Sequence, residues 1–107
     1  MGIFVVETYV VKSEKREEFT PALNEFLRYK ETHPDLFKGL RSWKLLRQEY
    51  GAVVGMYMEM WEFDSLAELE TNTDRLHADE GMKKIMKGFL ELVDPATLSC
   101  NIWSPVA

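Results

Sequence analysis

The first half of the chain shows two hydrophobic patterns. Residues Ile3 to Val11 alternate between two sides and are mainly β-branched or aromatic, which predicts a strand. From Phe19 to Leu27 the apolar residues recur at helical spacing with polar residues between them, so we expect an amphipathic helix. This helix should end near Thr32, because the residue before Pro34 is biased away from helical dihedral angles.

The start of this helix has two interpretations, because Pro21 interrupts its pattern. In one, Ser13 is the N-cap of a helix that begins near Glu14 and is kinked at the proline. In the other, Thr20 caps the helix and Pro21 takes its first position.

The second half predicts a hairpin, a helical region and a last strand. Leu40 to Glu49 and Ala52 to Phe63 are expected to be strands, and the short Tyr50-Gly51 connection implies that they are antiparallel. A helix should follow, because Ser65 and Glu68 match the S-x-x-E capping box. A polar cluster interrupts this helix at Thr71–Asp74, where Asp74 can cap a second helical segment. Asp94-Pro95 ends the second segment, and the last strand is expected at Thr97–Trp103.

This order of elements predicts the fold class. Strand, helix, strand, strand, helix, strand is the ferredoxin-like βαββαβ pattern, an α+β fold with a four-stranded antiparallel sheet whose central strands are the first and the third. Because the chain has no repeat, linker or low-complexity segment, we expect residues 1–107 to form a single domain.

The two faces of the sheet can be assigned from the alternation in its central strands. We expect the more uniformly apolar set to face the helices: Phe4, Val6, Thr8, Val10, Val54, Met56, Met58 and Met60. The opposite face then carries Glu7, Tyr9, Tyr57, Glu59 and Trp61 among aliphatic residues. With Val5 and Val53, this face is a larger apolar patch than a monomer usually exposes, so we expect it to pair in a homodimer.

Composition narrows the class of partner. The net charge of −5 disfavours nucleic-acid backbones as partners. The uncharged apolar run at Ala52–Met58 is far shorter than the ~20 residues that span a bilayer, so no membrane insertion is expected. Met1–Val6 has no basic flank that would mark a secretory signal, and Cys100 is the single cysteine, so a cytoplasmic location is expected.

Two passages of the chain resemble the dimeric α+β barrel superfamily, and within it the antibiotic-biosynthesis-monooxygenase-like group. The first is the strand-to-helix passage Val10–Phe19. The second is Tyr57–Leu69, in which a strand containing Trp61 leads through an acidic turn into a helix. The resemblance implies that two sheets pair into a barrel, and that a ligand cavity lies between each sheet and its helices or inside the barrel.

The superfamily includes cofactor-free monooxygenases of polycyclic aromatics, haem-degrading enzymes, isomerases, decarboxylases and proteins of unknown role. Membership alone therefore does not indicate which reaction a protein catalyses. Haem-degrading members use an Asn on the first strand with a Trp and a His on the second helix. Here the first strand carries Glu7 and Thr8, and the second helical region has His77 but no Trp. This departure argues against haem degradation.

Glu7, Glu59 and His77 are the candidate catalytic residues. The two glutamates lie on strands that should be adjacent, and like charges in an apolar space raise the pKa of at least one of them, as acid–base catalysis requires. The structural alternative is that Arg41, Lys44 or Arg47 on the neighbouring strand neutralises them. His77 can accept a proton near neutral pH, although its acidic neighbours Asp79 and Glu80 also fit a solvated helix.

Five aromatic residues could stack on a flat molecule or fill an interface: Tyr9, Trp43, Tyr57, Trp61 and Trp103. Of these, Tyr9, Tyr57 and Trp61 are the candidate ligand-binding residues. No metal site is expected, because the two histidines lack the spacing of a zinc site. Met56, Met58 and Met60 could bind Cu(I), but we expect them to fill the helix–sheet core opposite Met82 and Met86. Cys100 is expected to have a packing role.

Two functional hypotheses follow. In the first, the protein is a dimeric barrel that binds a small flat apolar organic ligand without a cofactor, and it is a cofactor-independent monooxygenase. In the second, it is a non-catalytic stress-response or binding module with no open active site. An open cavity between the sheet and the helices favours the first, and a filled one favours the second.

Overall fold

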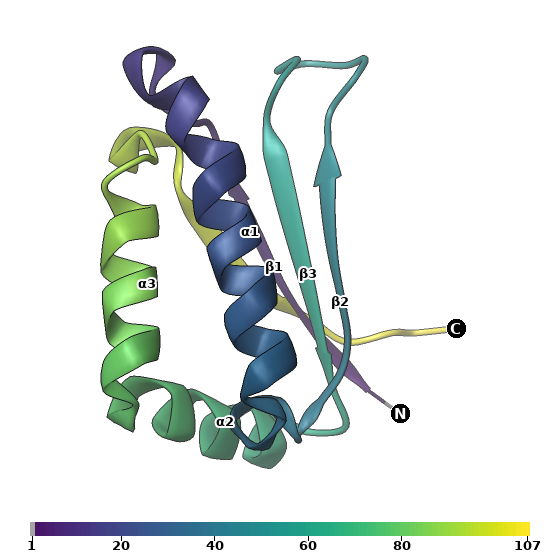
Figure 1. The fold of residues 1–107 in the computed structure, drawn as a ribbon. Helices are drawn as coiled ribbons and strands as arrows, with labels where there is room; N and C mark the ends of the chain where they lie inside the picture. The colour runs from purple at the N-terminus through teal and green to yellow at the C-terminus, as the bar shows by residue number, and fades with distance from the viewer. Residues whose placement is uncertain (1) are drawn as a thin grey trace.

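The computed structural model describes residues 2–107, in which a four-stranded antiparallel sheet is covered by helices on one face (Figure 1). The strands are β1 (Ile3–Tyr9), β2 (Leu40–Arg47), β3 (Tyr57–Phe63) and β4 (Ser99–Trp103). The helices are α1 (Arg16–Thr32), α2 (Leu66–Ala78) and α3 (Glu80–Leu90), with short 3-10 helices at Ser13–Lys15, Pro34–Phe37 and Pro95–Thr97. The strand order β2-β3-β1-β4 confirms the ferredoxin-like prediction, with β1 and β3 in the centre.

Helix α1 begins before Pro21 and ends at Thr32, as expected from the following proline. The proline lies in the second turn, where its missing N–H would have reached the carbonyl of Glu17. Thr20 is therefore not a cap. Ser13 is not the N-cap of α1 either, because it belongs to the preceding 3-10 helix.

The hairpin between β2 and β3 has a longer loop than its sequence predicts. Strand pairing stops at Arg47 and Tyr57, so residues 48–56 form the connection. Gly51 and Gly55 there have φ values of 141° and 90°, which are conformations that other residues rarely adopt. These glycines explain why the strand expected from Ala52 begins only at Tyr57.

Helices α2 and α3 are separated at Asp79. Ser65 caps α2 as predicted, since its hydroxyl accepts a hydrogen bond from the backbone N–H of Glu68 at 3.2 Å. The break predicted near Asp74 is wrong, because that residue lies inside α2. Asp79 caps α3 instead, and its carboxylate accepts hydrogen bonds from the Met82 N–H at 2.9 Å and from the Tyr29 hydroxyl of α1 at 2.5 Å.

The face assignment made from alternation is also wrong. The helices cover the face that carries Glu7, Tyr9, Glu59 and Trp61, where Tyr9 is 1% exposed. Alternation separates the residues of the two faces but does not show which face the helices cover. The covered face can contain Glu7 and Glu59 because Glu59 accepts hydrogen bonds from aromatic side chains and Glu7 borders a cavity. The patch expected to form a dimer interface therefore lies beneath the helices.

The other face of the sheet is not covered by any helix (Figure 1). It carries Phe4, Val6, Thr8, Leu46, Met58, Met60 and Trp103, whose positions follow from the strand register. Met58 and Met60 thus lie on the uncovered face and do not pack against Met82 and Met86, contrary to expectation. Within residues 2–107, no helix combines the length and the hydrophobicity needed to cross a membrane.

Candidate functional site

A cavity of about 620 Å³ lies between the sheet and the helices. This volume falls within the range of ~300–1,000 Å³ that is typical of small-molecule sites. The walls are mostly apolar and come from all four strands and all three α-helices. The cavity is open beside β4, where the lining residues Leu90, Leu98 and Ile102 are 56%, 39% and 54% exposed.

Glu59 is buried in the cavity wall and is held by three hydrogen bonds. The Tyr9 hydroxyl donates to its Oε2 at 2.6 Å. The indole N–H groups of Trp43 and Trp61 donate to its Oε1 at 3.3 Å and 3.2 Å. These donors satisfy both oxygens of a carboxylate that is only 9% exposed, as a buried charged group requires.

Glu7 lies directly opposite Glu59 in the pairing of β1 and β3 and also lines the cavity. In the part of the chain that the structure describes, no hydrogen bond or ion pair engages the Glu7 carboxyl. Burial, together with the nearby charge of Glu59, raises the pKa of Glu7 from 4.5 to about 7. This side chain can therefore both take up and release a proton near neutral pH.

The cations proposed to neutralise the two glutamates are engaged elsewhere. Arg41 lies 3.3 Å from Asp64, and Arg47 lies 2.7 Å from Glu49. Lys44 pairs with Met60 in the strand register, which places it on the uncovered face of the sheet. The structural alternative of a neutralising cation on β2 is thus not found within one subunit.

The aromatic candidates are divided between the cavity and the core. Trp61 and Tyr9 line the cavity, whereas Tyr57 lies outside its lining and packs in the core, where its ring stacks on Phe19 with centroids 4.4 Å apart. Trp43 also lines the cavity, although it is not one of the three predicted ligand-binding residues. In the structure Trp43 is the register partner of Trp61 across the β2–β3 hairpin, because the loop between these strands is longer than the predicted turn at Tyr50-Gly51.

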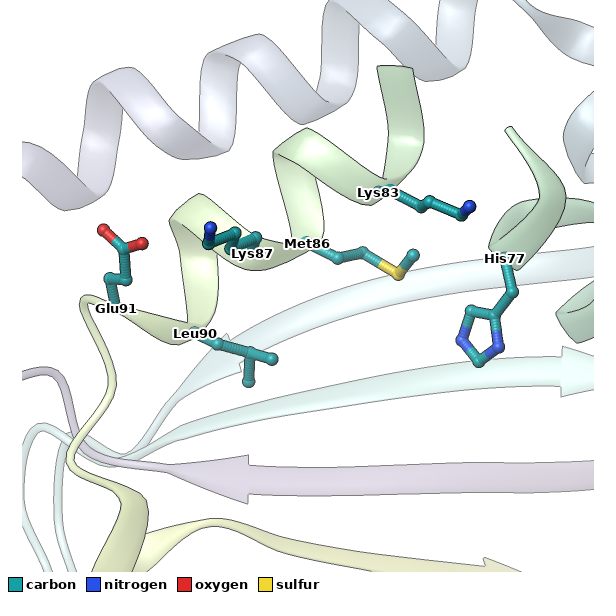
Figure 2. Close-up of a pocket in the computed structure, with 6 residues that line it drawn as sticks. All are labelled: His77, Lys83, Met86, Lys87, Leu90 and Glu91. Carbon is teal, nitrogen blue, oxygen red and sulfur yellow. The ribbon is translucent and has the colours of Figure 1, made fainter. Parts of the chain in front are cut away.

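His77 lies at the edge of the cavity, on α2, and is exposed. It also borders an open groove of about 500 Å³ on the side of α3, shown in Figure 2 with Lys83, Met86, Lys87, Leu90 and Glu91. The groove adjoins the cavity, because His77, Met86 and Leu90 line both. No hydrogen bond joins His77 to Glu7 or Glu59 among residues 2–107. The structure therefore brings together two of the three catalytic candidates and leaves the histidine at the rim.

Cys100 pairs with Glu7 across β1 and β4, and it lines the cavity beside the opening. It is exposed, so the expected packing role is wrong. Burial of the sulfur, and then the charge of Glu7, raise the pKa of its thiol, which lowers its reactivity as a nucleophile. Across the described residues, no cluster of three or more His, Cys, Asp or Glu side chains is arranged to hold a metal ion.

No protein-family model and no curated protein matches this chain. Solved structures do resemble it. A NIPSNAP family protein from Agrobacterium tumefaciens has a TM-score of 0.76 at 17% identity, with 98% of this chain and 86% of that protein covered. A proposed antibiotic biosynthesis monooxygenase from Bacteroides thetaiotaomicron has a TM-score of 0.68 at 16% identity, covering 99% and 90%.

A dimeric protein of unknown function with a ferredoxin-like fold, from Bacteroides fragilis, has a TM-score of 0.67 at 13% identity. The alignment covers 97% of this chain and 96% of that protein. At these identities the likeness concerns the fold. The chain therefore has a ferredoxin-like α+β fold, which it shares with these solved structures.

Proposed function

We propose that this protein binds a small, flat, largely apolar organic molecule between its sheet and its helices, and that Glu7 exchanges a proton with that ligand. The observation that carries the proposal is an unpaired carboxyl group, with a pKa raised to about 7, in the wall of an apolar cavity. A general base works best when its pKa lies near the working pH, which is the condition met here.

A planar phenol or quinol suits this arrangement. Its hydroxyl would give a proton to Glu7, which becomes a neutral carboxylic acid as the ring oxygen becomes an anion, so the total charge in the cavity does not change. The deprotonated, electron-rich ring can then react directly with O₂. One oxygen atom is added to a ring carbon, the other leaves as water, and the ring supplies the electrons as it is oxidised to a quinone. This makes a cofactor-independent monooxygenase the favoured reaction class. The resemblance in fold to a proposed antibiotic biosynthesis monooxygenase supports this choice.

The walls of the cavity suit a flat ring. Trp43, Trp61 and Phe26 line it, with the Phe26 ring 5.4 Å from Trp43 and 5.9 Å from Trp61. Aromatic stacking contributes about 0.5–1.5 kcal/mol beyond the burial of apolar area. Because the cavity is open and of ligand size, the alternative of a closed, non-catalytic module is less favoured.

We also propose that two copies of the chain pair through the uncovered face of the sheet. This face presents the apolar side chains of Met58 (36% exposed), Leu46 (48%) and Trp103 (60%) beside the polar Lys44, Glu62 and Asn101. Exposed apolar side chains with polar neighbours are typical of protein interaction sites. A structural neighbour with the same fold is described as dimeric, which supports pairing by a second copy. The ligand cavity lies on the opposite side of the sheet and remains open in such a dimer.

Calorimetric titration with 2-naphthol tests the proposed binding. The variant Cys100→Phe places a ring in the cavity beside Glu7 and should abolish binding, because Cys100 is already exposed and the fold should tolerate the change. The matched control Asn24→Phe adds the same ring to the exposed side of α1 and should bind as the wild type does. Binding that persists in Cys100→Phe would place the ligand outside the cavity.

Proton transfer is tested separately from binding. Oxygen uptake would be measured with a panel of planar phenols and quinols, for the wild type and for Glu7→Gln. We expect the variant to bind 2-naphthol and to lose turnover of any active substrate, since an amide cannot accept the proton. A variant that retains full turnover would show that Glu7 is not the base.

A further inference from the structure

Most of the charged side chains in the cavity wall are acidic. Glu7 and Glu59 lie on the sheet, and α2 adds Glu70 and Asp74, both exposed at the rim. The only basic side chain in the wall of this cavity is that of His77, so neither lysine nor arginine lines it among the described residues. Helices α1 and α3 contribute apolar side chains to the lining, including Phe26 and Met82.

Glu7 and Glu59 differ in what they can offer a ligand. Glu59 already accepts hydrogen bonds from Tyr9, Trp43 and Trp61. Glu7 has no such donor among the described residues, although it shares the same face. An unpaired carboxylate in an apolar wall is stabilised by a ligand that brings an N–H donor with a positive charge.

From this distribution we infer that the cavity selects the charge of its ligand: it takes flat apolar molecules that are neutral or carry a cationic amine, which pairs with Glu7, and it rejects those that carry a carboxylate. The inference deepens the proposed function and rests on it. A carboxylate in the cavity would meet Glu7 and Glu59 with no cation in the wall to compensate, and like charges at short range in a poorly solvated space repel strongly. Aromatic walls add favourable contacts with an ammonium group.

The groove on the side of α3 differs from the cavity because it carries lysine side chains. Lys83, Lys87 and Glu91 border it (Figure 2). The nitrogen of Lys83 lies 3.1 Å from Glu80. These lysines are exposed and do not line the cavity itself. An anionic ligand that paired with these lysines would leave Glu7 unpaired. The groove and the cavity are therefore expected to prefer ligands of different charge.

The test uses three probes that share one ring system: 2-naphthylmethylammonium, 2-naphthol and 2-naphthoate. At neutral pH, calorimetric titration should give the ammonium probe an affinity at least about tenfold higher than that of the naphthoate, with the naphthol between them. Glu7→Gln should remove most of this preference. The matched control Glu25→Gln, on the exposed side of α1, removes the same charge and should leave the ranking unchanged.

Each outcome has a distinct reading. Naphthoate binding as tightly as the ammonium probe would overturn the charge selection while leaving the proposed binding site intact. A preference that survives Glu7→Gln unchanged would overturn the assignment of the cation to Glu7. Failure of all three probes to bind would overturn the proposed function, and this inference with it.

Discussion

Glu7 on β1 and Glu59 on β3 stand directly opposite one another on the helix-covered face of the sheet. Three aromatic donors bind Glu59, and none of the described residues binds Glu7. The two carboxyl groups occupy paired strand positions but differ in their hydrogen-bond partners. This difference leaves one group that is structurally engaged and one that can respond to a ligand.

The first prediction concerns stability and pH. Glu7 keeps its proton up to a pKa of about 7 when folded, but loses it near 4.5 when unfolded. The folded state therefore has an advantage that is complete below pH 4.5 and is lost as the pH rises through about 7. The loss amounts to at most about 3.5 kcal/mol, because one pKa unit corresponds to roughly 1.4 kcal/mol.

Glu7→Gln should remove this dependence and be more stable than the wild type at neutral pH. Urea unfolding of both proteins across this pH range measures the difference, with Glu25→Gln as the control for a lost surface charge. A constant difference between wild type and Glu7→Gln at all pH values would contradict the prediction.

The second prediction concerns the anchoring of Glu59. Tyr9→Phe removes the hydroxyl that donates to Glu59 at 2.6 Å, in a position that is 1% exposed. We expect a loss of about 2 kcal/mol in the free energy of unfolding, as is usual for a hydrogen bond to a charged group. Tyr50→Phe, at a side chain that is 95% exposed, is the control and should change nothing. Equal stability of Tyr9→Phe and wild type in urea would show that this bond contributes no net stability.

The third prediction concerns assembly. Met58→Lys places a charge on the uncovered sheet face and should convert a dimer into a monomer in light scattering. Leu27→Lys is a close control, because Leu27 on α1 is 38% exposed and Met58 is 36% exposed. We expect the control to remain dimeric. A monomeric wild type at micromolar concentration, or dissociation caused by the control, would exclude pairing through this face.

The fourth prediction separates the ring of Trp61 from its N–H group. Trp61→Phe keeps an aromatic wall but loses the hydrogen bond to Glu59. Trp61→Ala loses both and should weaken 2-naphthol binding by about tenfold, the equivalent of ~1.4 kcal/mol of stacking. Tryptophan-fluorescence titration should find Trp61→Phe within about threefold of the wild type. If the phenylalanine variant binds as poorly as the alanine variant, the ring is not the ligand platform.

The order of elements could be predicted from the sequence because it depends on local patterns. The helix end near Thr32 and the Ser65 cap follow from backbone rules that act within a few residues. The break at Asp79 could not be found in this way, because it depends partly on the Tyr29 hydroxyl, which is far away along the chain. The early end of β2 and late start of β3 likewise follow from the conformations of the loop glycines.

The candidate site was found in part for a related reason. Adjacency of Glu7 and Glu59 follows from the expected strand order, and the structure confirms that they are register partners. Their position beneath the helices could not be predicted, because it depends on tertiary partners: donors for Glu59 and a cavity for Glu7. A rule that places the more apolar face under the helices fails where the covered face contains a site with polar side chains.

The proton exchange of Glu7 near neutral pH is tested most directly by an NMR titration of its side-chain carboxyl. The ¹³C shift of this carboxyl is followed in the wild type and in Glu59→Gln. We expect a midpoint at about 7 in the wild type. In Glu59→Gln the midpoint should be lower but stay above 4.5, because burial raises the pKa of Glu7 more than the charge of Glu59 does. A wild-type midpoint at 4.5 or below would contradict the account, since Glu7 would then be an ordinary ionised carboxylate with no proton to exchange near neutral pH.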